Sequence, residues 1–322
     1  MTSDARQVRL ASWPTPLEPA PRLARAIGLE ADDLWLKRDD LVGLGGGGNK
    51  VRKLEWIVGA ALEDDADVLV TTGAAQSNHA RLTAAAGARL GLDVVLVLKG
   101  EAGRGSSGNL ALDGLLGARV VWAGDTDNAG MADAADQVVA DLVRDGRRPA
   151  LVPFGGSSAL GARGYRECAD ELLAQAPDLR TVVTAAGSGG TMAGLVAGLG
   201  DDRVLGVHVG AVADPARTVA DLVVELTGAD CDPHGLRLRL DQVGGGYATL
   251  PEPVVAALAT TARTEGVVLD PVYTGRAMAG LVAAVEAGDV RPGERTVFLH
   301  TGGLPGLFGS AAAVLRAEAM LR

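Results

Sequence analysis

A regular alternation of apolar runs and helical patterns is the feature that most constrains the fold of this chain of 322 residues. Short apolar runs predict strands at residues 67–72, 93–98, 118–122, 150–153, 181–186, 204–209 and 295–299. Helical patterns follow these strands, and further helices are predicted at 251–266, 273–288 and 304–321. Because parallel strands need crossover connections, the alternation predicts an α/β fold in which helices cover both faces of a parallel sheet.

Three local signals refine this plan. Four prolines between residues 12 and 26 predict an extended lead-in, and Leu34–Lys37 has the pattern of a short strand. Gly73 is expected to end the strand at 67–72, and the next helix is expected to begin near residues 76–79. Because no low-complexity linker divides the chain, we expect a lobe inserted into a larger domain rather than two separate domains.

Composition and charge disfavour several classes of function. The net charge is −10 and basic residues are scattered, which disfavours a nucleic-acid surface. No apolar run approaches the ~20 residues that a membrane span needs, so no membrane partner is expected. The two cysteines give no disulfide framework and the four histidines show no ligand spacing. We therefore predict a cytoplasmic protein without a metal site.

A glycine-rich loop followed by a lysine is the first candidate for chemistry. Five of the six residues from Gly43 to Gly48 are glycine, and Lys50 follows where an apolar helical pattern begins. The positive end of the helix dipole disfavours an ammonium group and favours a neutral amine, which can form a Schiff base. A flexible turn before a solvated lysine is the alternative interpretation, and this stretch alone leaves both open.

Two other strand-to-helix junctions carry small polar residues, at the places where ligands bind in open parallel sheets. Ser77 and Asn78 are either helix caps or ligands of a substrate carboxylate. Residues 187–191 combine three glycines with a serine and a threonine, which favours a phosphate site over an ordinary tight turn. Nucleotide signatures fail, because Asn49 and Met192 stand where these motifs require glycine. A phosphate site beside a reactive lysine predicts pyridoxal phosphate as the cofactor.

Six ordered blocks of the sequence resemble a known family. Residues 47–55 are similar to the cofactor-lysine motif of the D-cysteine desulfhydrase and 1-aminocyclopropane-1-carboxylate (ACC) deaminase family. The other blocks lie at residues 76–79, 155–161, 187–191, 270–275 and 300–303, in the order of that family. The resemblance covers nearly the whole chain.

This resemblance implies an architecture. The fold would be that of the tryptophan synthase β-subunit group (fold type II), with two open, twisted, mostly parallel sheets flanked by helices. Residues 1–51 and 161–322 would form a large cofactor-binding domain, and residues 52–160 a small inserted α/β domain. The resemblance also implies a homodimer that binds a small amino-acid substrate.

The resemblance further assigns roles to individual residues. The implied catalytic residues are Lys50 as the Schiff-base lysine, Ser77, Tyr273 and Tyr247; the implied cofactor contacts are Lys50, Asn78, Gly187, Ser188, Gly189, Gly190, Thr191, Thr274 and Thr301; and the implied substrate contacts are Ser77, Asn78, His79 and Gly156. For Tyr247, ordinary packing with a solvated hydroxyl is the alternative interpretation.

Two positions bear on which reaction is catalysed. ACC deaminases carry Glu and Leu where this chain has Thr274 and Thr301. By resemblance, residue 274 faces the pyridine nitrogen of the cofactor, and a threonine cannot supply the negative charge that stabilises a pyridinium ring. We therefore expect β-elimination from a small β-substituted amino acid, with D-cysteine giving pyruvate, ammonia and sulfide. Either Lys50 or Ser77 would remove the Cα proton.

Three alternatives remain beside D-cysteine desulfhydrase activity. Arg163 and Arg276 lie near the site blocks and could favour the sulfonate of L-cysteate, although both could equally be surface residues. ACC deaminase activity is the second alternative. The third is a non-catalytic protein that keeps the cofactor, which the presence of Lys50, Ser77 and Tyr273 disfavours.

Overall fold

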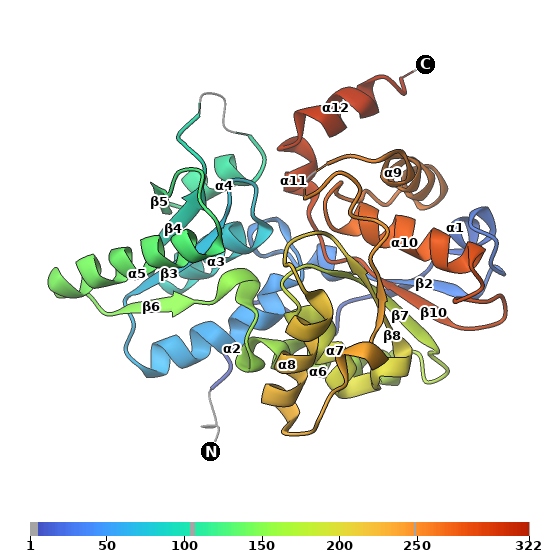
Figure 1. The fold of residues 1–322 in the computed structure, drawn as a ribbon, viewed down its shortest axis with the longest axis horizontal. Coiled ribbons are helices and arrows are strands. Elements are labelled where there is room, and N and C mark those ends of the chain that lie inside the picture. Colours follow the sequence, from blue (N-terminus) through green and yellow to red (C-terminus); the bar gives the residue numbers. More distant parts are fainter. Residues whose placement is uncertain (1–5, 104–106, 248, 322) are drawn as a thin grey trace.

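The computed structural model describes residues 6–103, 107–247 and 249–321, and it contains two sheets (Figure 1). The larger sheet has the order β1-β2-β10-β7-β8-β9, and only β1 runs antiparallel to its neighbour. Its strands are β1 (Leu17–Pro19), β2 (Leu34–Lys37), β10 (Thr296–Leu299), β7 (Thr181–Ala186), β8 (Val204–His208) and β9 (Arg237–Arg239). The predicted α/β class with mostly parallel sheets is confirmed.

The smaller sheet is parallel throughout, with the order β5-β4-β3-β6. Its strands are β5 (Arg119–Trp122), β4 (Asp93–Lys99), β3 (Val68–Ala74) and β6 (Pro149–Val152). All four lie inside the range predicted for a small domain. The predicted boundaries, after residues 51 and 160, fall within the first turns of α2 (Lys50–Glu63) and α6 (Ala159–Gln175) and not in loops between domains. The division into domains therefore stays a prediction.

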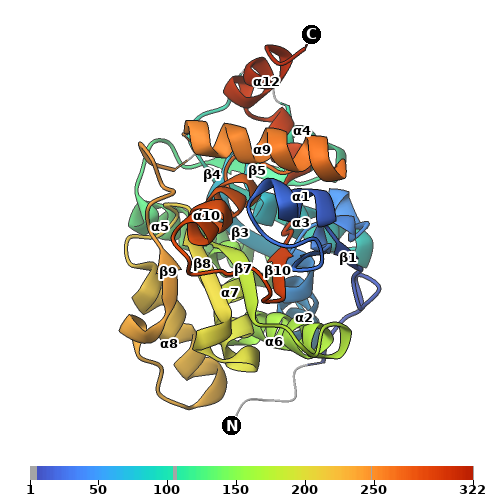
Figure 2. The ribbon, with the colours of Figure 1, turned by 90° about the vertical axis from the view of Figure 1, so that its right-hand side faces the viewer.

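Helices cover both faces of each sheet. On the larger sheet, α1 (Pro21–Ala26), α9 (Glu252–Glu265) and α10 (Thr274–Glu286) pack on one face, and α6, α7 (Gly190–Leu199) and α8 (Pro215–Thr227) pack on the other (Figure 2). On the smaller sheet, α2, α3 (Asn78–Leu90) and α4 (Asn109–Leu115) lie on one face and α5 (Asn128–Arg144) on the other. None of the helices that the structure describes is long and apolar enough to cross a membrane.

Close helix packing fixes α2, α6 and α7 relative to one another. A Cβ atom on Gly164 of α6 would lie 2.2 Å from the carbonyl oxygen of Arg52 in α2. Similarly, a Cβ atom on Gly194 of α7 would lie 2.3 Å from the carbonyl oxygen of Ala162 in α6. Only glycine allows these backbones to approach so closely, so the helix that carries Lys50 is set against the helix that follows β7.

A buried ion network ties the same helices to the segment after β2. Arg52 donates to both carboxylate oxygens of Asp39 at 2.9 Å and to Glu171 of α6 at 2.8 Å. The hydroxyl of Tyr165 also donates to Asp39. Burial alone would raise the pKa of Asp39, but the charge and hydrogen bonds of Arg52 outweigh it and lower the pKa. The carboxylate is therefore held ionised in the interior.

The structure differs from the sequence-based expectations at three places. Residues 21–26 form α1 rather than extended chain, because Pro21 occupies the first turn, where its fixed φ suits a helix. Gly73 does not end β3, since it pairs with Leu98 and the strand runs on to Ala74. The last helix is two helices, α11 (Leu304–Phe308) and α12 (Ala311–Glu318), because Gly309 packs against Gln76 and Ser310 caps α12.

Candidate active site

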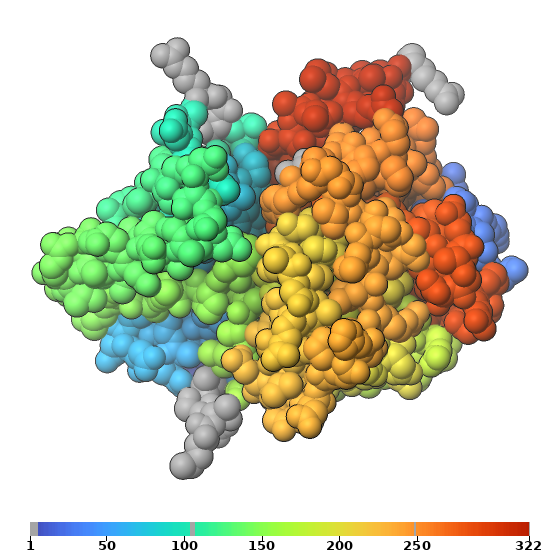
Figure 3. Space-filling model, viewed as in Figure 1, coloured from blue at the N-terminus to red at the C-terminus, as the bar shows by residue number. Residues whose placement is uncertain are grey.

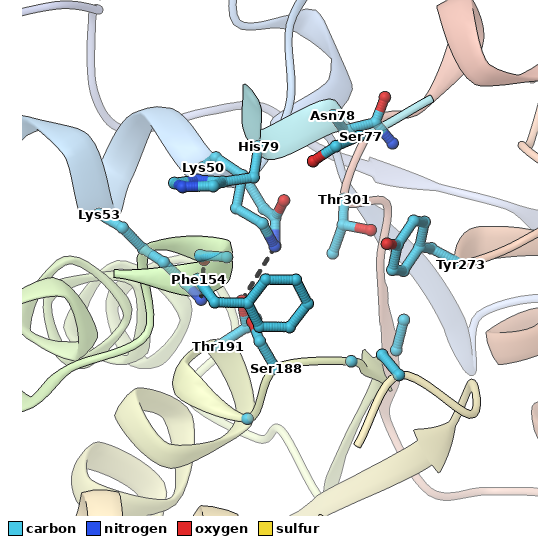
Figure 4. A pocket seen from close by; sticks show the side chains of 16 residues that line it. Lys50, Lys53, Ser77, Asn78, His79, Phe154, Ser188, Thr191, Tyr273 and Thr301 are labelled. Atoms are coloured by element: carbon cyan, nitrogen blue, oxygen red, sulfur yellow. Dashed lines mark hydrogen bonds between the residues drawn. The ribbon is translucent and has the colours of Figure 1, made fainter. Parts of the chain in front are cut away.

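A cavity lies at the carboxyl ends of strands from both sheets, where an open α/β fold places its ligands (Figure 4). Its lining comes from the segments after β2, β3, β6, β7, β8 and β10 and from the start of α10. The lining residues are Asn49, Lys50, Lys53, Ser77, Asn78, His79, Phe154, Gly155, Ala185, Gly187, Ser188, Gly189, Thr191, Ala211, Tyr273 and Thr301.

Lys50 is the first residue of α2 and is partly buried. Burial lowers the pKa of its amine to about 8, so the neutral form is far more populated near physiological pH than in a free lysine. The glycine loop before it is tightly confined: a Cβ on Gly47, whose φ is +77°, would lie 2.1 Å from the carbonyl oxygen of Asp40. Arg81 donates to the carbonyls of Gly45 and Gly47. The loop thus holds a reactive lysine in a fixed place rather than forming a flexible turn.

Lys53, one helical turn beyond Lys50, belongs to a group of hydrogen-bond donors at the start of α7. Its amine donates to the Gly155 carbonyl (3.2 Å) and to the Ser157 hydroxyl (3.1 Å). The Ser157 hydroxyl also accepts from the Gly190 N–H at 3.1 Å and lies 2.7 Å from the Ser188 hydroxyl. The N-cap residue of α7, Gly189, has no side chain, and the positive end of the helix faces the same place. These groups can hold a phosphate.

Asn49 and Thr191 fix the glycine loop to α7. The amide of Asn49 donates to the Thr191 hydroxyl at 2.9 Å, and its backbone N–H donates to the carbonyl of Thr301 at 3.1 Å. Both contacts join the loop to the ends of central strands, β7 and β10. The position of Lys50 therefore depends on segments from three distant parts of the chain.

The start of α3 contributes Ser77, Asn78 and His79. The Ser77 hydroxyl accepts from the Ala80 N–H at 3.1 Å, so it caps the helix and also lines the cavity. The amide oxygen of Asn78 accepts from Asn109 at 3.0 Å, which orients the side chain.

His79 is buried at the base of this wall. Burial and the neighbouring charges of Lys50 and Lys53 lower its pKa well below the ordinary value, so the ring is neutral. The Thr71 hydroxyl donates to the carbonyl of Val152, so it accepts from Nε2 of His79 at 2.9 Å. Nδ1 is then an acceptor, and it is buried without a partner among the described residues.

Two tyrosines meet at the open side of the cavity. The hydroxyls of Tyr247 and Tyr273 lie 2.5 Å apart, and their rings pack edge to face with centroids 6.2 Å apart. Burial raises the pKa of both phenols. Tyr273 lines the cavity, whereas Tyr247 reaches it only through Tyr273. Tyr247 is also 39% exposed, so its catalytic role stays a prediction.

Four of the residues assigned by resemblance are not on the cavity wall. Gly190 contributes its N–H from behind, Gly156 lies beside Lys53 and His79, and Tyr247 stands behind Tyr273. The hydroxyl of Thr274 donates to the carboxylate of Asp270 at 2.7 Å and accepts from the Asp270 N–H at 2.7 Å. The side chain is fully buried, so Thr274 does not border the cavity, in contrast to the expectation from the sequence. The threonines on the cavity wall are Thr191 and Thr301.

Neither arginine that could favour a sulfonate lines this cavity. Arg276 is fully buried and donates to the carbonyls of Val209, Gly246 and Thr249. The guanidinium of Arg163 lies over the ring of Trp56, 5.2 Å from its centroid. No group of three metal-binding side chains occurs in the part of the chain that the structure describes.

Sequence reasoning missed several residues of the wall, chiefly Asn49, Lys53 and Phe154. For Lys53 a signal existed, since residues three apart share one face of a helix. Phe154 directly precedes the glycines of the block at 155–161, and its ring lies between Lys53 and Tyr273 in the view of Figure 4.

Comparison with known proteins identifies the family. A family model described as pyridoxal-phosphate dependent enzyme matches residues 8–302. A Klebsiella pneumoniae protein named D-cysteine desulfhydrase is 40% identical over 323 residues, covering 94% of this chain and 95% of its own. A Pyrococcus horikoshii protein named "Putative 1-aminocyclopropane-1-carboxylate deaminase" is 39% identical over 312 residues, covering 94% and 93%.

Solved structures agree with this. A structure described as that of an ACC deaminase homologue superimposes with a TM-score of 0.86 at 35% identity, covering 97% of this chain and 96% of that one. Threonine deaminase from Solanum lycopersicum shares the fold, with a TM-score of 0.63 at 19% identity. The chain therefore belongs to the family of pyridoxal-phosphate-dependent enzymes. Within that family it is a lyase of the group that holds ACC deaminases and D-cysteine desulfhydrases.

The residues present fit pyridoxal phosphate. The start of α7 together with Lys53 and Ser157 offers donors for the phosphate, and Lys50 offers an amine with a lowered pKa. Nδ1 of His79 is a buried acceptor without a partner among the described residues, which fits a site whose wall contacts a polar ligand.

Proposed function

We propose that this chain is a β-elimination lyase that releases pyruvate and ammonia from a small β-substituted amino acid, with D-cysteine as the first substrate to test. The cofactor, when bound, supplies an electron sink that stabilises negative charge at Cα of an amino acid. The residues of the chain supply the remaining requirements: a proton acceptor, a place for the carboxylate and a wall that selects the substituent.

Lys50 would remove the Cα proton. An amine with a pKa of about 8 can accept a proton near neutral pH and return it later, which suits a general base. Ser77 is the second candidate for the base, because its hydroxyl lines the cavity and is held in place by a hydrogen bond from the Ala80 N–H at 3.1 Å. The free N–H groups at the start of α3, with Asn78, would hold the substrate carboxylate.

The observation that carries the proposal is the side chain of Thr301. It borders the cavity at the end of β10, where ACC deaminases carry leucine. A hydroxyl at this place is a poor neighbour for a hydrocarbon ring and offers a hydrogen bond to a polar group. Thr274 supports the proposal less than the sequence indicated, because its hydroxyl is occupied by Asp270.

L-cysteate, ACC and the absence of turnover are the competing possibilities. L-cysteate loses support because neither Arg163 nor Arg276 lines the cavity. A protein that binds cofactor without turnover would not need Lys50, Ser77 and Tyr273 around one cavity. A homodimer and a cytoplasmic location remain predictions from the family resemblance.

A pyruvate-release screen tests the proposal. Purified holoenzyme is assayed with D- and L-cysteine, β-chloroalanine, L-cysteate, D-serine and ACC. We expect pyruvate from D-cysteine or another β-substituted alanine and little from ACC. The variant Thr301→Leu should raise the ratio of ACC turnover to β-elimination. A wild-type preference for ACC over every β-substituted alanine would contradict the proposal.

A further inference from the structure

A second cavity adjoins the candidate active site, with a volume of about 560 Å³. It lies where the two parts of the molecule meet, between α5 and β6 on one side and residues after β8 on the other (Figure 3). Ser77, Phe154, Ala211 and Tyr273 line both cavities. The second cavity is therefore continuous with the place where the substrate would react.

The lining of the second cavity is mainly apolar, and several of its side chains are exposed to solvent. Leu151, Phe154 and Tyr247 belong to this lining, and their side chains are 49%, 44% and 39% exposed. Met131 and Ala132 of α5 add to the same wall. Apolar side chains scattered over a surface need no explanation, but their clustering in a concave site of several hundred Å³ is typical of ligand binding.

The polar groups of the second cavity do not favour a charged ligand. Lys99 is the cation on the wall, and its amine is 3.4 Å from the carboxylate of Asp125. Asp136 on α5 contributes a negative charge, and Asn128 and Thr72 are neutral. An anionic group would meet Asp136 and would compete with Asp125 for Lys99, so the lining suits an uncharged, apolar group.

We propose that the second cavity receives the β-substituent of the substrate and that this substituent is an uncharged S-alkyl or S-aryl group of several carbons. The inference rests on the proposed β-elimination and names its substrate class. The thiol group of cysteine is comparable to one water molecule, which occupies about 30 Å³ in the liquid. A cavity of about 560 Å³ is instead in the range of sites for small organic molecules, about 300–1,000 Å³.

The reaction balances without a further oxidant or reductant. The Cα proton passes to a base on the wall, and the Cβ–S bond breaks with its electron pair staying on sulfur. One proton converts the thiolate to R–SH, and one water completes the hydrolysis. The substrate R–S–CH₂–CH(NH₃⁺)–COO⁻ and water thus give R–SH, pyruvate and ammonium. A sulfur link also explains how an apolar group can leave, because a thiolate carries the negative charge.

A series of S-substituted cysteines tests the inference. Both enantiomers of cysteine and of its S-methyl, S-propyl, S-pentyl and S-benzyl derivatives are assayed for pyruvate with the holoenzyme. We expect kcat/KM to rise at least tenfold from the S-methyl to the S-benzyl compound. If short substrates are turned over but kcat/KM is flat or falls along the series, only this inference is overturned. If no β-substituted alanine releases pyruvate, the proposed function itself fails.

A matched pair of variants on α5 places the effect in the second cavity. Ala132 is exposed and lines it, whereas Ala129 is exposed on the same helix and does not. The kcat/KM ratio of the S-benzyl compound to cysteine should fall at least tenfold in Ala132→Phe and stay within twofold of wild type in Ala129→Phe. An unchanged ratio in Ala132→Phe would overturn the inference.

An equilibrium measurement decides the matter if Ala132→Phe does not fold, which its melting temperature would show. Amino acids without a leaving group, from alanine through norvaline and norleucine to phenylalanine, are titrated as competitive inhibitors of cysteine turnover by the wild-type enzyme. We expect the inhibition constant to fall at least tenfold along the series. A constant that is flat or rises with chain length would overturn the inference.

Discussion

The two adjoining cavities are built in opposite ways. The cofactor cavity is narrow and polar, and its groups are held by hydrogen bonds that involve backbone atoms of Gly155 and Gly190. The second cavity is wide, and side chains such as Leu151 and Met131 face it without a polar partner. Directional contacts fix one ligand, whereas apolar surface accepts any group of suitable size.

This difference separates two tasks. A phosphorylated cofactor is held best by groups that are in place before it arrives, because ordering them at the time of binding would cost free energy. A substituent that leaves as product must be held loosely. Phe154 borders both cavities, so its ring lies at the boundary between the polar cofactor cavity and the apolar second cavity.

The test with the largest expected effect replaces one lysine in each cavity by alanine. Lys50→Ala should remove covalent attachment of the cofactor and lower kcat by about 10²–10⁴-fold, because the general base is lost. Lys99→Ala, in the second cavity, should retain attachment. Borohydride reduction, which fixes the cofactor to the amine that binds it, followed by peptide mapping, should label Lys50. Label on Lys53 or Lys99 instead would contradict the assignment.

The next test concerns the ion network behind the cofactor cavity. Arg52→Met leaves the carboxylate of Asp39 buried without its main partner, so we expect the free energy of unfolding to fall by about 3–5 kcal/mol. Urea unfolding of the holoenzyme measures this. Arg163→Met, which removes a guanidinium stacked on Trp56, is the control and should cost about 1 kcal/mol or less. Equal losses in both variants would mean that the network has no special role.

A smaller effect is expected from one methyl group at the start of α7. In Gly190→Ala the new Cβ would lie 2.7 Å from Oγ of Ser157 and 3.0 Å from Nζ of Lys53. Displacing these groups should raise the Kd for pyridoxal phosphate at least tenfold, which is about 1.4 kcal/mol. Gly114→Ala, in α4 with no atom near its Cβ, should leave the Kd unchanged. Gly189 is a poorer site for this test, because its Cβ would point at Thr218.

The last prediction concerns the pH dependence of cofactor uptake. Only the neutral amine of Lys50 reacts with an aldehyde, and burial lowers its pKa from 10.5 to about 8. The uptake rate of cofactor-free protein should therefore rise about tenfold per pH unit below pH 8 and level off above it. Measurements from pH 6.5 to 9.5 avoid titration of the phosphate, whose second pKa is about 6. A rate still rising at pH 9.5, as for a free lysine, would show that Lys50 is not buried in this way.

Much of the fold follows from the sequence because its signals are local. The apolar run at 181–186 coincides with β7, since every residue of that strand is buried on both faces. β9 (Arg237–Arg239) left no such signal, because an edge strand of three partly exposed residues carries no apolar run. The break at Gly309 was also hidden, since it depends on contact with Gln76, far away in the sequence.

The candidate site divides in the same manner. The glycine loop, Ser77 and residues 187–191 stand at strand-to-helix junctions that the sequence marks, so they could be found. The orientation of Thr274 could not, because it is set by hydrogen bonds to Asp270 that no spacing reveals. The second cavity left no motif, since it arises only when α5 meets residues that follow β8.

The hydrogen bond from Asn49 to Thr191 has a consequence for folding. It joins residues 142 positions apart, and the backbone of Asn49 reaches further still, to Thr301. Contacts between such distant segments form late, because the loops they close are long. A nascent chain in which β10 has not yet been synthesised therefore lacks the hydrogen bond from Asn49 to Thr301 that helps to position Lys50. We therefore expect the amine to keep the ordinary pKa of a lysine until β10 has joined the sheet.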